Sequence, residues 1–509
     1  MNITTPIPSH ADTVVLGGGT AGSAVAGRLA AAGDQSVLLV EAGPDYGALD
    51  GEQWPTALLD GRVLPDSHDW GYTSAAKSGE PDHGLQRARV IGGCSSHNGC
   101  IAIWGSRVDY DGWAEMLGGA AGADWATDNL LPLFHRVART LRVRRFEDPQ
   151  VTPFHRACLD AAVRAGVPLV DDLNDLDEDV GVATAPVNMH EGMRWNAALA
   201  YLDPVRHQSN LTVVGDTIVD RLRFGRGLVT GVEVIGPDGL STIEAGRVVL
   251  CAGVYGSPAI IVRSGIGPAD ELKRLGITFV LDMPGVGLNL HDHPTIYLRF
   301  SGSDRLDELM DAFVANGNTP YSEQSLAKLR SRHCTRAFDL HLFPYSTAEP
   351  DENGRWGCTF PVAYMTPRSR GRLQLRGRDP AAAPLIDTGY LSDADDADLS
   401  VLMDGMEQTR RIAAQDPLAQ LVGPELAETA QWVGRDDVRR ACLHYYHPVG
   451  TCRMGGAFDS MGVVNERGAV HGIENLHVAD AAIMPVIPRA NTNLPTLVIA
   501  ERIAAWLGA

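Results

Sequence analysis

The sequence predicts a mixed α/β fold (α+β overall) built on a Rossmann-like, doubly wound parallel sheet, and three features near the N-terminus predict it. A short apolar run, 13–16, has the composition of a buried parallel strand. A glycine-rich turn and a helical stretch from Ala21 to about Ala32 follow directly. A second apolar run, 37–40, then ends at Glu41. Strand, turn, helix and strand in this order predict a βαβ unit.

The turn at residues 17–22 reads G-x-G-x-x-G. Gly17 permits a tight turn, Gly19 lets a pyrophosphate approach the backbone, and Gly22 lets helix and strand pack closely. Thr20 and Ala21 open the helix, whose free N–H groups attract phosphate. Glu41 is placed to accept hydrogen bonds from ribose hydroxyls. We therefore predict a dinucleotide site, and this pattern alone does not separate NAD from FAD.

Length and charge narrow the class of protein. The 509 residues predict two large domains, or one domain with large insertions. A net charge of −20 disfavours nucleic acid as a partner. No window is long and apolar enough for a membrane span. The N-terminus lacks the pattern of a secretory signal, so we expect a cytoplasmic protein.

Cysteine and histidine spacing raises the question of a metal. The eight cysteines are expected to be reduced thiols. Cys94-x-x-His97-x-x-Cys100 and the pair His291 and His293 both lack the further ligands that a zinc site needs. We therefore predict no metal site, and a structural role for His291 and His293.

Several motifs along the chain carry a resemblance to one family. Residues 89–102, RVIGGCSSHNGCIA, resemble the flavin-contacting signature of the glucose–methanol–choline oxidoreductases. Residues 69–72, 257–267, 444–455, 476–481 and 491–496 are similar to further motifs of that family. The resemblance covers nearly the whole chain and implies FAD as cofactor. The spelling Cys-Ser-Ser-His-Asn is most similar to the choline oxidase subgroup.

The glycine-rich motif and the resemblance together give a set of cofactor-binding residues. These are Gly17, Gly19, Thr20, Ala21, Gly22, Glu41, Trp70, Arg89, Gly92, Gly93, His97, Asn98, Ile101, Val219, Asp480 and Ala481. In the choline oxidase subgroup the histidine that matches His97 is bonded to the flavin 8α carbon, which implies covalent FAD here. The alternative is that His97 only packs beside the flavin ring.

The resemblance implies oxidation of an alcohol. His447 would take the hydroxyl proton while hydride leaves carbon for flavin N5. Asn493 is expected to hold the substrate oxygen as the second catalytic residue. Asn491 is an adjacent alternative, and Asn493 is preferred because its spacing to Thr496 fits the family pattern.

Three departures indicate that this is not a choline oxidase. Choline oxidases place a glutamate after an Asp-His-Pro triplet, and this chain has Thr295 there. Phe343 replaces an active-site histidine, and Gly99 replaces a small hydroxyl residue. A neutral alcohol is therefore the expected substrate.

Other features of function stay open at this point. The electron acceptor is oxygen, a quinone or another carrier, and an oligomer is compatible with the sequence. The alternatives to an alcohol oxidase or dehydrogenase are an FAD-containing hydroxynitrile lyase and a flavoprotein that has lost catalysis. Retention of His447 and Asn493 argues against the latter.

The resemblance also implies how the domains divide. The FAD-binding domain is expected to comprise residues 1–158, 193–294 and 445–509. The substrate-binding domain, an antiparallel sheet covered by helices, is expected to comprise 159–192 and 295–444. Residues 371–376 alternate as a half-exposed strand should.

Overall fold

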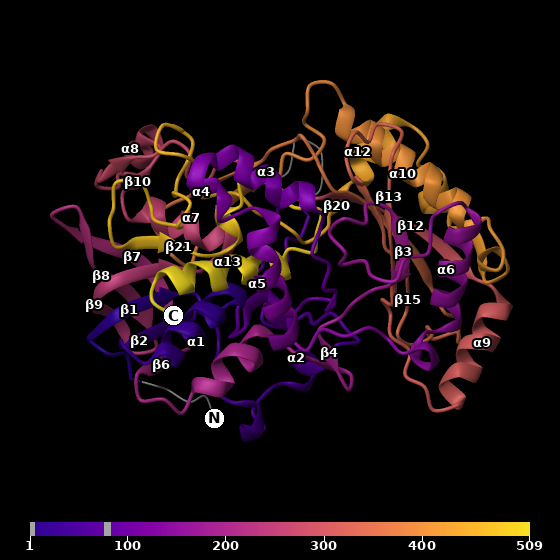
Figure 1. Ribbon diagram of the computed structural model, residues 1–509, viewed down its shortest axis with the longest axis horizontal. Helices are drawn as coiled ribbons and strands as arrows, with labels where there is room; N and C mark the ends of the chain where they lie inside the picture. Colours follow the sequence, from indigo (N-terminus) through magenta and orange to yellow (C-terminus); the bar gives the residue numbers. More distant parts are fainter. Residues whose placement is uncertain (1–5, 76–82) are drawn as a thin grey trace.

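The computed structural model describes residues 6–75 and 83–509. Two large sheets dominate these residues, and Figure 1 shows them side by side, each with its own helices. The first sheet has the order β6-β2-β1-β9-β8-β7, and β21 also pairs with β9. Its strands are β1 (His10–Leu16), β2 (Val37–Val40), β6 (Leu211–Val214), β7 (Ile218–Gly225), β8 (Leu228–Gly236), β9 (Gly239–Leu250) and β21 (Leu476–Val478).

The first sheet is parallel where the nucleotide motif lies. β1 pairs in parallel with both β2 and β9, whereas β7, β8 and β9 form an antiparallel meander. Val14, Val15 and Leu16 are fully buried, as expected for a central parallel strand covered on both faces. The predicted βαβ unit is confirmed, with its first strand beginning earlier, at His10.

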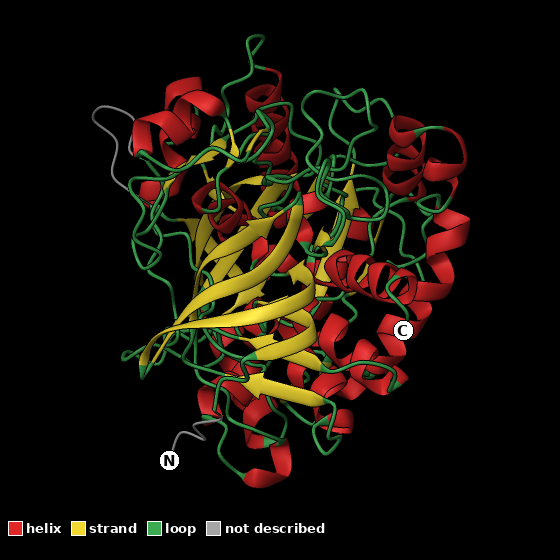
Figure 2. Cartoon of the chain, turned by 90° about the vertical axis from the view of Figure 1, so that its left-hand side faces the viewer, coloured by secondary structure: helices red, strands yellow, loops and turns green. Residues whose placement is uncertain are grey.

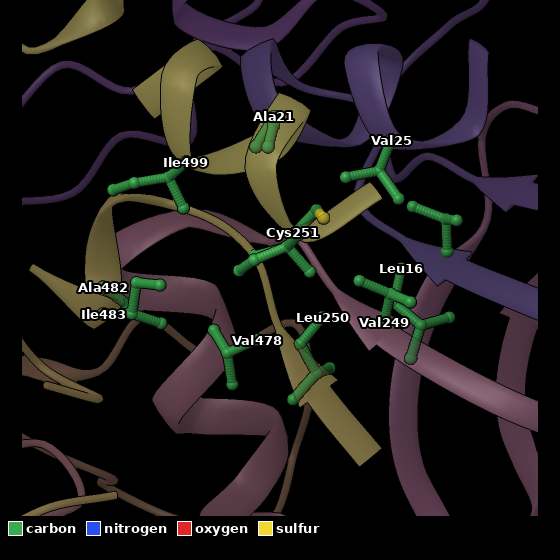
Figure 3. Packing of buried hydrophobic residues seen from close by; sticks show 14 of the residues in the cluster. Leu16, Ala21, Val25, Val249, Leu250, Cys251, Val478, Ala482, Ile483 and Ile499 are labelled. Carbon is green, nitrogen blue, oxygen red and sulfur yellow. The ribbon is translucent and has the colours of Figure 1, made fainter. Parts of the chain in front are cut away.

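Helices pack around this sheet, which lies in front in Figure 2. They are α1 (Thr20–Ala32), α2 (Thr56–Leu59), α3 (Arg107–Leu117), α4 (Gly119–Ala123), α5 (Thr127–Thr140), α7 (Gly253–Arg263), α8 (Ala269–Leu275) and α13 (Asn493–Trp506). α1 packs against α13, from the opposite end of the chain. Figure 3 shows part of the core that they cover, and Leu16, Val25, Leu250, Val478 and Ile499 belong to this one cluster. The N- and C-terminal segments therefore build one domain.

The second sheet is antiparallel, as the resemblance implied, with the order β19-β12-β16-β14-β13-β3 and with β15 and β20 attached. Its strands are β3 (Gly181–Thr184), β12 (Pro294–Gly302), β13 (Ser325–Leu329), β14 (Leu340–Leu342), β15 (Tyr345–Ser346), β16 (Cys358–Tyr364), β19 (Val422–Glu425) and β20 (Leu443–His444). Its helices are α6 (Pro153–Arg164), α9 (Asp304–Ala315), α10 (Ala397–Ala413), α11 (Ala427–Ala430) and α12 (Arg435–Ala441). In Figure 1, α6 and α9 lie on the side of the second sheet away from the first sheet, and α6 packs against α10.

Two short segments cross the expected domain division. α6 begins at Pro153 and packs on α9, α10 and the second sheet, although residues up to 158 were assigned to the FAD-binding domain. The strand expected at 371–376 is β17 (Arg372–Gln374), which pairs with β18 (Leu385–Asp387) in a separate two-stranded sheet. Leu373 and Ile386 belong to the first core. Two further strand pairs are β4 (Met189–His190) with β5 (Met193–Arg194), and β10 (Ile266–Gly267) with β11 (Leu281–Asp282).

Candidate active site

A cavity of about 1160 Å³ runs from the glycine-rich turn to the second sheet. Most residues expected at the cofactor line it, although they come from distant parts of the chain. They are Gly17, Gly19, Thr20, Ala21, Glu41, Trp70, Gly93, His97, Asn98, Ile101, Val219, Asp480 and Ala481. His447 and Asn493 line it as well, whereas Gly22, Arg89 and Gly92 do not.

The glycine-rich turn is shaped by close backbone contacts. A Cβ on Gly22 would lie 1.8 Å from the carbonyl oxygen of Gly17, so Gly22 supports the turn from beneath. Gly17 has φ +100°, and its Cβ would meet the carbonyl oxygen of Cys251 at 2.6 Å. A Cβ on Gly93 would come within 2.6 Å of the Cα of Gly19, which brings the two loops together. No side chain caps α1, so its first N–H groups stay available to an anion.

Glu41 is held by backbone on both carboxyl oxygens. Oε2 accepts from the N–H of Gly18 and Oε1 from the N–H of Gly43, each at 2.8 Å. Burial raises the pKa of this carboxyl to about 7, and the two backbone hydrogen bonds act to lower it. Each oxygen keeps a second lone pair, so the fixed carboxyl suits two adjacent ribose hydroxyls.

The loop that carries His97 is braced by a fully buried arginine. Arg194 donates to the carbonyl oxygens of Asn98 at 2.9 Å and Leu58 at 2.7 Å. Nε2 of His97 is buried and has no hydrogen-bond partner among the described residues. Burial, followed by the charge of Arg194, lowers the pKa of His97 to about 4. The imidazole is therefore neutral and keeps a free lone pair at the cavity wall.

Arg89 and Gly92 brace the cavity from outside it, and Asp480 braces it from within the wall. The guanidinium of Arg89 lies 5.0 Å from the ring centroid of Trp70, and its Nε donates to the carbonyl of Ala42. The N–H of Gly92 donates to the carbonyl of Gly18 at 2.7 Å, which ties the His97 loop to the glycine-rich turn. Asp480 accepts from Ser257 and from the N–H groups of Gly253 and Ala482.

His447 is contacted from three sides. Its Nδ1 lies 3.0 Å from Nδ1 of His293, and its Nε2 lies 3.2 Å from the amide nitrogen of Asn491. Its backbone N–H donates to Oδ1 of Asp292 at 2.9 Å. Burial, and then the nearby imidazoles and Arg87, hold the pKa of His447 well below its usual value. The ring is neutral near pH 7 and therefore able to accept a proton.

Asp292 fixes this histidine pair. Its Oδ1 also accepts from the N–H of His293 at 2.8 Å, and its Oδ2 accepts from the hydroxyl of Tyr390 at 2.7 Å. Burial raises the pKa of Asp292 to about 6. One carboxyl thus holds the backbone of both His293 and His447.

Two residues near His447 lie differently from the sequence-based expectation. Asn491, rather than the preferred Asn493, contacts His447; Asn493 begins α13 and lines the cavity, but its amide nitrogen has no partner among the described residues. His293 was assigned a structural role, yet it touches His447. His291 does pack structurally, with Nε2 bonded to the carbonyl of Pro367 and Nδ1 accepting from Ile487.

The metal hypotheses find no support in this region. Across residues 6–75 and 83–509, no group of three or more histidine, cysteine, aspartate or glutamate side chains could hold a metal ion. All eight cysteines are free thiols. In the same residues no helix has the length and apolar character of a membrane span.

Sequence reasoning missed several residues of the cavity wall. Glu323, Tyr297 and Tyr345 lie outside the quoted motifs, and no local pattern marks them. Phe343 and Gly99, two of the noted departures, do line the cavity. Thr295, the third, does not: it is fully buried, and its hydroxyl donates to the carbonyl of Val362 at 3.0 Å.

Comparison with known proteins agrees with this geometry. Residues 11–295 and 367–500 match the N- and C-terminal family models described as GMC oxidoreductase. The chain is 32% identical to an oxygen-dependent choline dehydrogenase of Burkholderia thailandensis, covering 97% of this chain and 93% of that protein. A choline dehydrogenase of the same description from Paraburkholderia phymatum is 33% identical, covering 97% and 91%.

Solved structures show the same fold over nearly the whole length. Pyridoxine 4-oxidase from Mesorbium loti superposes with a TM-score of 0.84 at 28% identity, covering 97% of this chain and 98% of that one. A formate oxidase superposes with a TM-score of 0.82 at 24% identity, covering 98% of each. The chain therefore belongs to the GMC oxidoreductase family, whose members are FAD-dependent oxidoreductases.

Proposed function

We propose that this protein oxidises a CH–OH group of an alcohol to an aldehyde or ketone, with His447 as the base. The observation that carries the proposal is a neutral, buried imidazole at the cavity wall, fixed through its backbone by Asp292 and through Nδ1 by His293. Its Nε2 points to Asn491, which also lines the cavity. A base with its orientation set in advance suits abstraction of a hydroxyl proton.

The cofactor residues fit FAD. Gly19 and Gly93 approach closely beside the uncapped start of α1, a place for pyrophosphate, and Glu41 offers two fixed oxygens to a ribose. FAD bound there would supply the two-electron acceptor for hydride. His447 would take the hydroxyl proton at Nε2, and the Asn491 amide would donate to the substrate oxygen as negative charge develops on it.

Substituting the base tests this proposal. His447→Ala is expected to slow anaerobic bleaching of the flavin by an alcohol by ~10²–10⁴-fold, with flavin content unchanged. His447→Gln keeps a polar side chain of similar reach and should be slowed comparably. Normal bleaching in either variant would refute the role of His447. Cyanide release from a cyanohydrin with the flavin still oxidised would instead support the lyase alternative.

We also propose that FAD is bonded through its 8α carbon to Nε2 of His97. The support is a buried, neutral imidazole nitrogen without a partner at the cavity wall. Arg194 fixes the adjacent backbone, so the ring has a stable position. The electron acceptor, oxygen or a quinone, is identified by which of the two restores the oxidised spectrum after anaerobic bleaching.

A further inference from the structure

The side chain of Glu323 places a carboxyl at the cavity wall, and this carboxyl accepts no hydrogen bond from the described residues. It lies two residues before β13, and no N–H or O–H of the described residues donates to it. The charge of Arg194 acts on this carboxyl, but the guanidinium of Arg194 donates its hydrogen bonds to backbone carbonyls such as those of Asn98 and Leu58. Glu323 is half-buried, and a carboxyl removed from most of the solvent without hydrogen-bond donors is costly unless a ligand supplies them.

Gly99 explains why the carboxyl fits there. A Cβ on Gly99 would lie only 2.3 Å from Oε2 of Glu323. The carboxyl thus occupies the space next to the backbone two residues beyond His97, at the boundary between the cofactor loop and the second domain. Gly99, which departs from the choline oxidase pattern, therefore leaves the space that the carboxyl of Glu323 occupies.

Aromatic rings line the same part of the cavity. Tyr297, Phe343 and Tyr345 come from the second domain, and Tyr445 lies with its ring centroid 4.6 Å from that of His447. Aromatic faces attract cations. Burial raises the pKa of Tyr445, and the negative charge of Glu323 raises it further, so the two groups lie within electrostatic range of each other. A carboxyl, aromatic rings and a base therefore surround one space.

We propose that the substrate is an alcohol that carries a protonated nitrogen, whose N–H donates to Glu323 while its hydroxyl lies at His447. This inference rests on the proposed alcohol oxidation and names its substrate class. It replaces the expectation of a neutral alcohol, whose electrostatic argument came from Thr295 and whose other two departures were Phe343 and Gly99. Because Thr295 does not line the cavity, its lack of charge does not decide the question.

Three probes of similar shape test the inference in the holoenzyme. Protonated N,N-dimethylaminoethanol has an N–H, 3-methylbutan-1-ol is its neutral counterpart, and choline has a charge without an N–H. The saturation constant is taken from anaerobic flavin bleaching or, where no bleaching occurs, from titration of the flavin absorbance. The amine is expected to bind about 10- to 100-fold tighter than either other probe, as for a hydrogen bond between charged groups.

Two variants test whether Glu323 causes the tighter binding of the amine. Glu323→Gln should reduce it to less than about threefold, and Gly99→Ala should do the same by displacing the carboxyl. Glu428→Gln is the matched control, because that carboxylate also lines the cavity but is paired with Arg299 at 3.1 Å. Its preference should equal that of the unaltered protein.

Several outcomes would overturn the inference. They are equal binding of amine and neutral alcohol, no saturable binding of the amine, equal binding of choline and amine, or a preference that survives in Glu323→Gln. If these occur while alcohols still bleach the flavin through His447, only this inference fails. If the amine preference persists while His447→Ala bleaches normally, the proposed base fails instead.

Discussion

Nδ1 of His293 lies 3.0 Å from Nδ1 of His447, with both rings buried and nearly perpendicular. Burial lowers the pKa of His293 to about 3 and that of His447 well below its usual value, so both rings are neutral. At this distance the two nitrogens form a hydrogen bond in which one carries the proton and the other accepts it. The amide of Asn491 donates to Nε2 of His447, so Nδ1 of His447 carries the proton and His293 accepts it. His293 therefore sets the tautomer in which Nε2 of His447 is unprotonated and can act as a base.

Removing His293 is expected to slow hydride transfer while leaving the fold intact. His293→Leu should reduce the rate of anaerobic flavin bleaching about 10-fold, the worth of one net hydrogen bond. His293→Asn restores an acceptor and should recover part of the rate. His291→Asn is the control: it should lower the melting temperature, because His291 bonds to backbone, without changing bleaching per folded molecule. Equal rates in His293→Leu and the unaltered protein would exclude the tautomer role.

The two neighbouring asparagines are expected to differ in their effect on the rate. Asn491→Ala removes the amide that contacts His447 and should reduce bleaching by about 10²–10³-fold, as for loss of a donor to a developing oxyanion. Asn493→Ala should cost less than about 10-fold, because its amide makes no contact with His447. Stopped-flow bleaching at saturating alcohol measures both. A larger effect at 493 than at 491 would favour the assignment made from spacing over the one made from the contact.

The cofactor half of the site was largely predictable because its residues sit in local patterns. The turn at 17–22 and the loop around His97 are fixed by glycines whose spacing shows in the sequence, and both reach the cavity. Choosing between Asn491 and Asn493 required the start of α13, since a helix boundary decides which side chain faces His447. Sequence spacing does not locate such a boundary to one residue.

The substrate half was not predictable by the same means. Glu323 and Gly99 are more than two hundred residues apart, and only the packing of the second sheet against the His97 loop brings them together. Thr295 shows the opposite case. Its place in a motif suggested that its side chain lines the cavity. In the structure β12 pairs with β16, and the Thr295 hydroxyl donates to the carbonyl of Val362 instead. Contacts of this kind depend on tertiary structure rather than on local pattern.

Acid precipitation is expected to leave the flavin with the protein. If Nε2 of His97 carries FAD, the pellet should stay yellow, and His97→Ala should give a colourless pellet with free FAD in solution. His97→Ala should still bind FAD before precipitation, because Glu41 and the glycine-rich turn are untouched. A colourless pellet from the unaltered protein, with flavin content confirmed beforehand, would rule out the bond.

Stability should fall with rising pH because of Glu323, and the sign follows from its pKa. Burial raises the pKa of this carboxyl from 4.5 to about 7, so the folded protein holds its proton more tightly than the unfolded chain. The stability that this tighter proton binding contributes is fully present below pH 4.5 and is lost as the pH rises through 7. Glu323→Gln lacks the ionisable group. Between pH 4.5 and pH 8 its free energy of unfolding should therefore rise by about 3 kcal/mol relative to that of the unaltered protein.

Urea unfolding of the two proteins at pH 5 and pH 8 measures this difference. Protonated N,N-dimethylaminoethanol should narrow it at pH 8, since its N–H stabilises the ionised carboxyl of the folded state. The neutral 3-methylbutan-1-ol should not. A stability difference that is the same at both pH values would mean that the carboxyl of Glu323 is not perturbed. Since the proposed contact depends on an unsatisfied carboxyl at this position, such a result would also weaken the assignment of Glu323 to the substrate nitrogen.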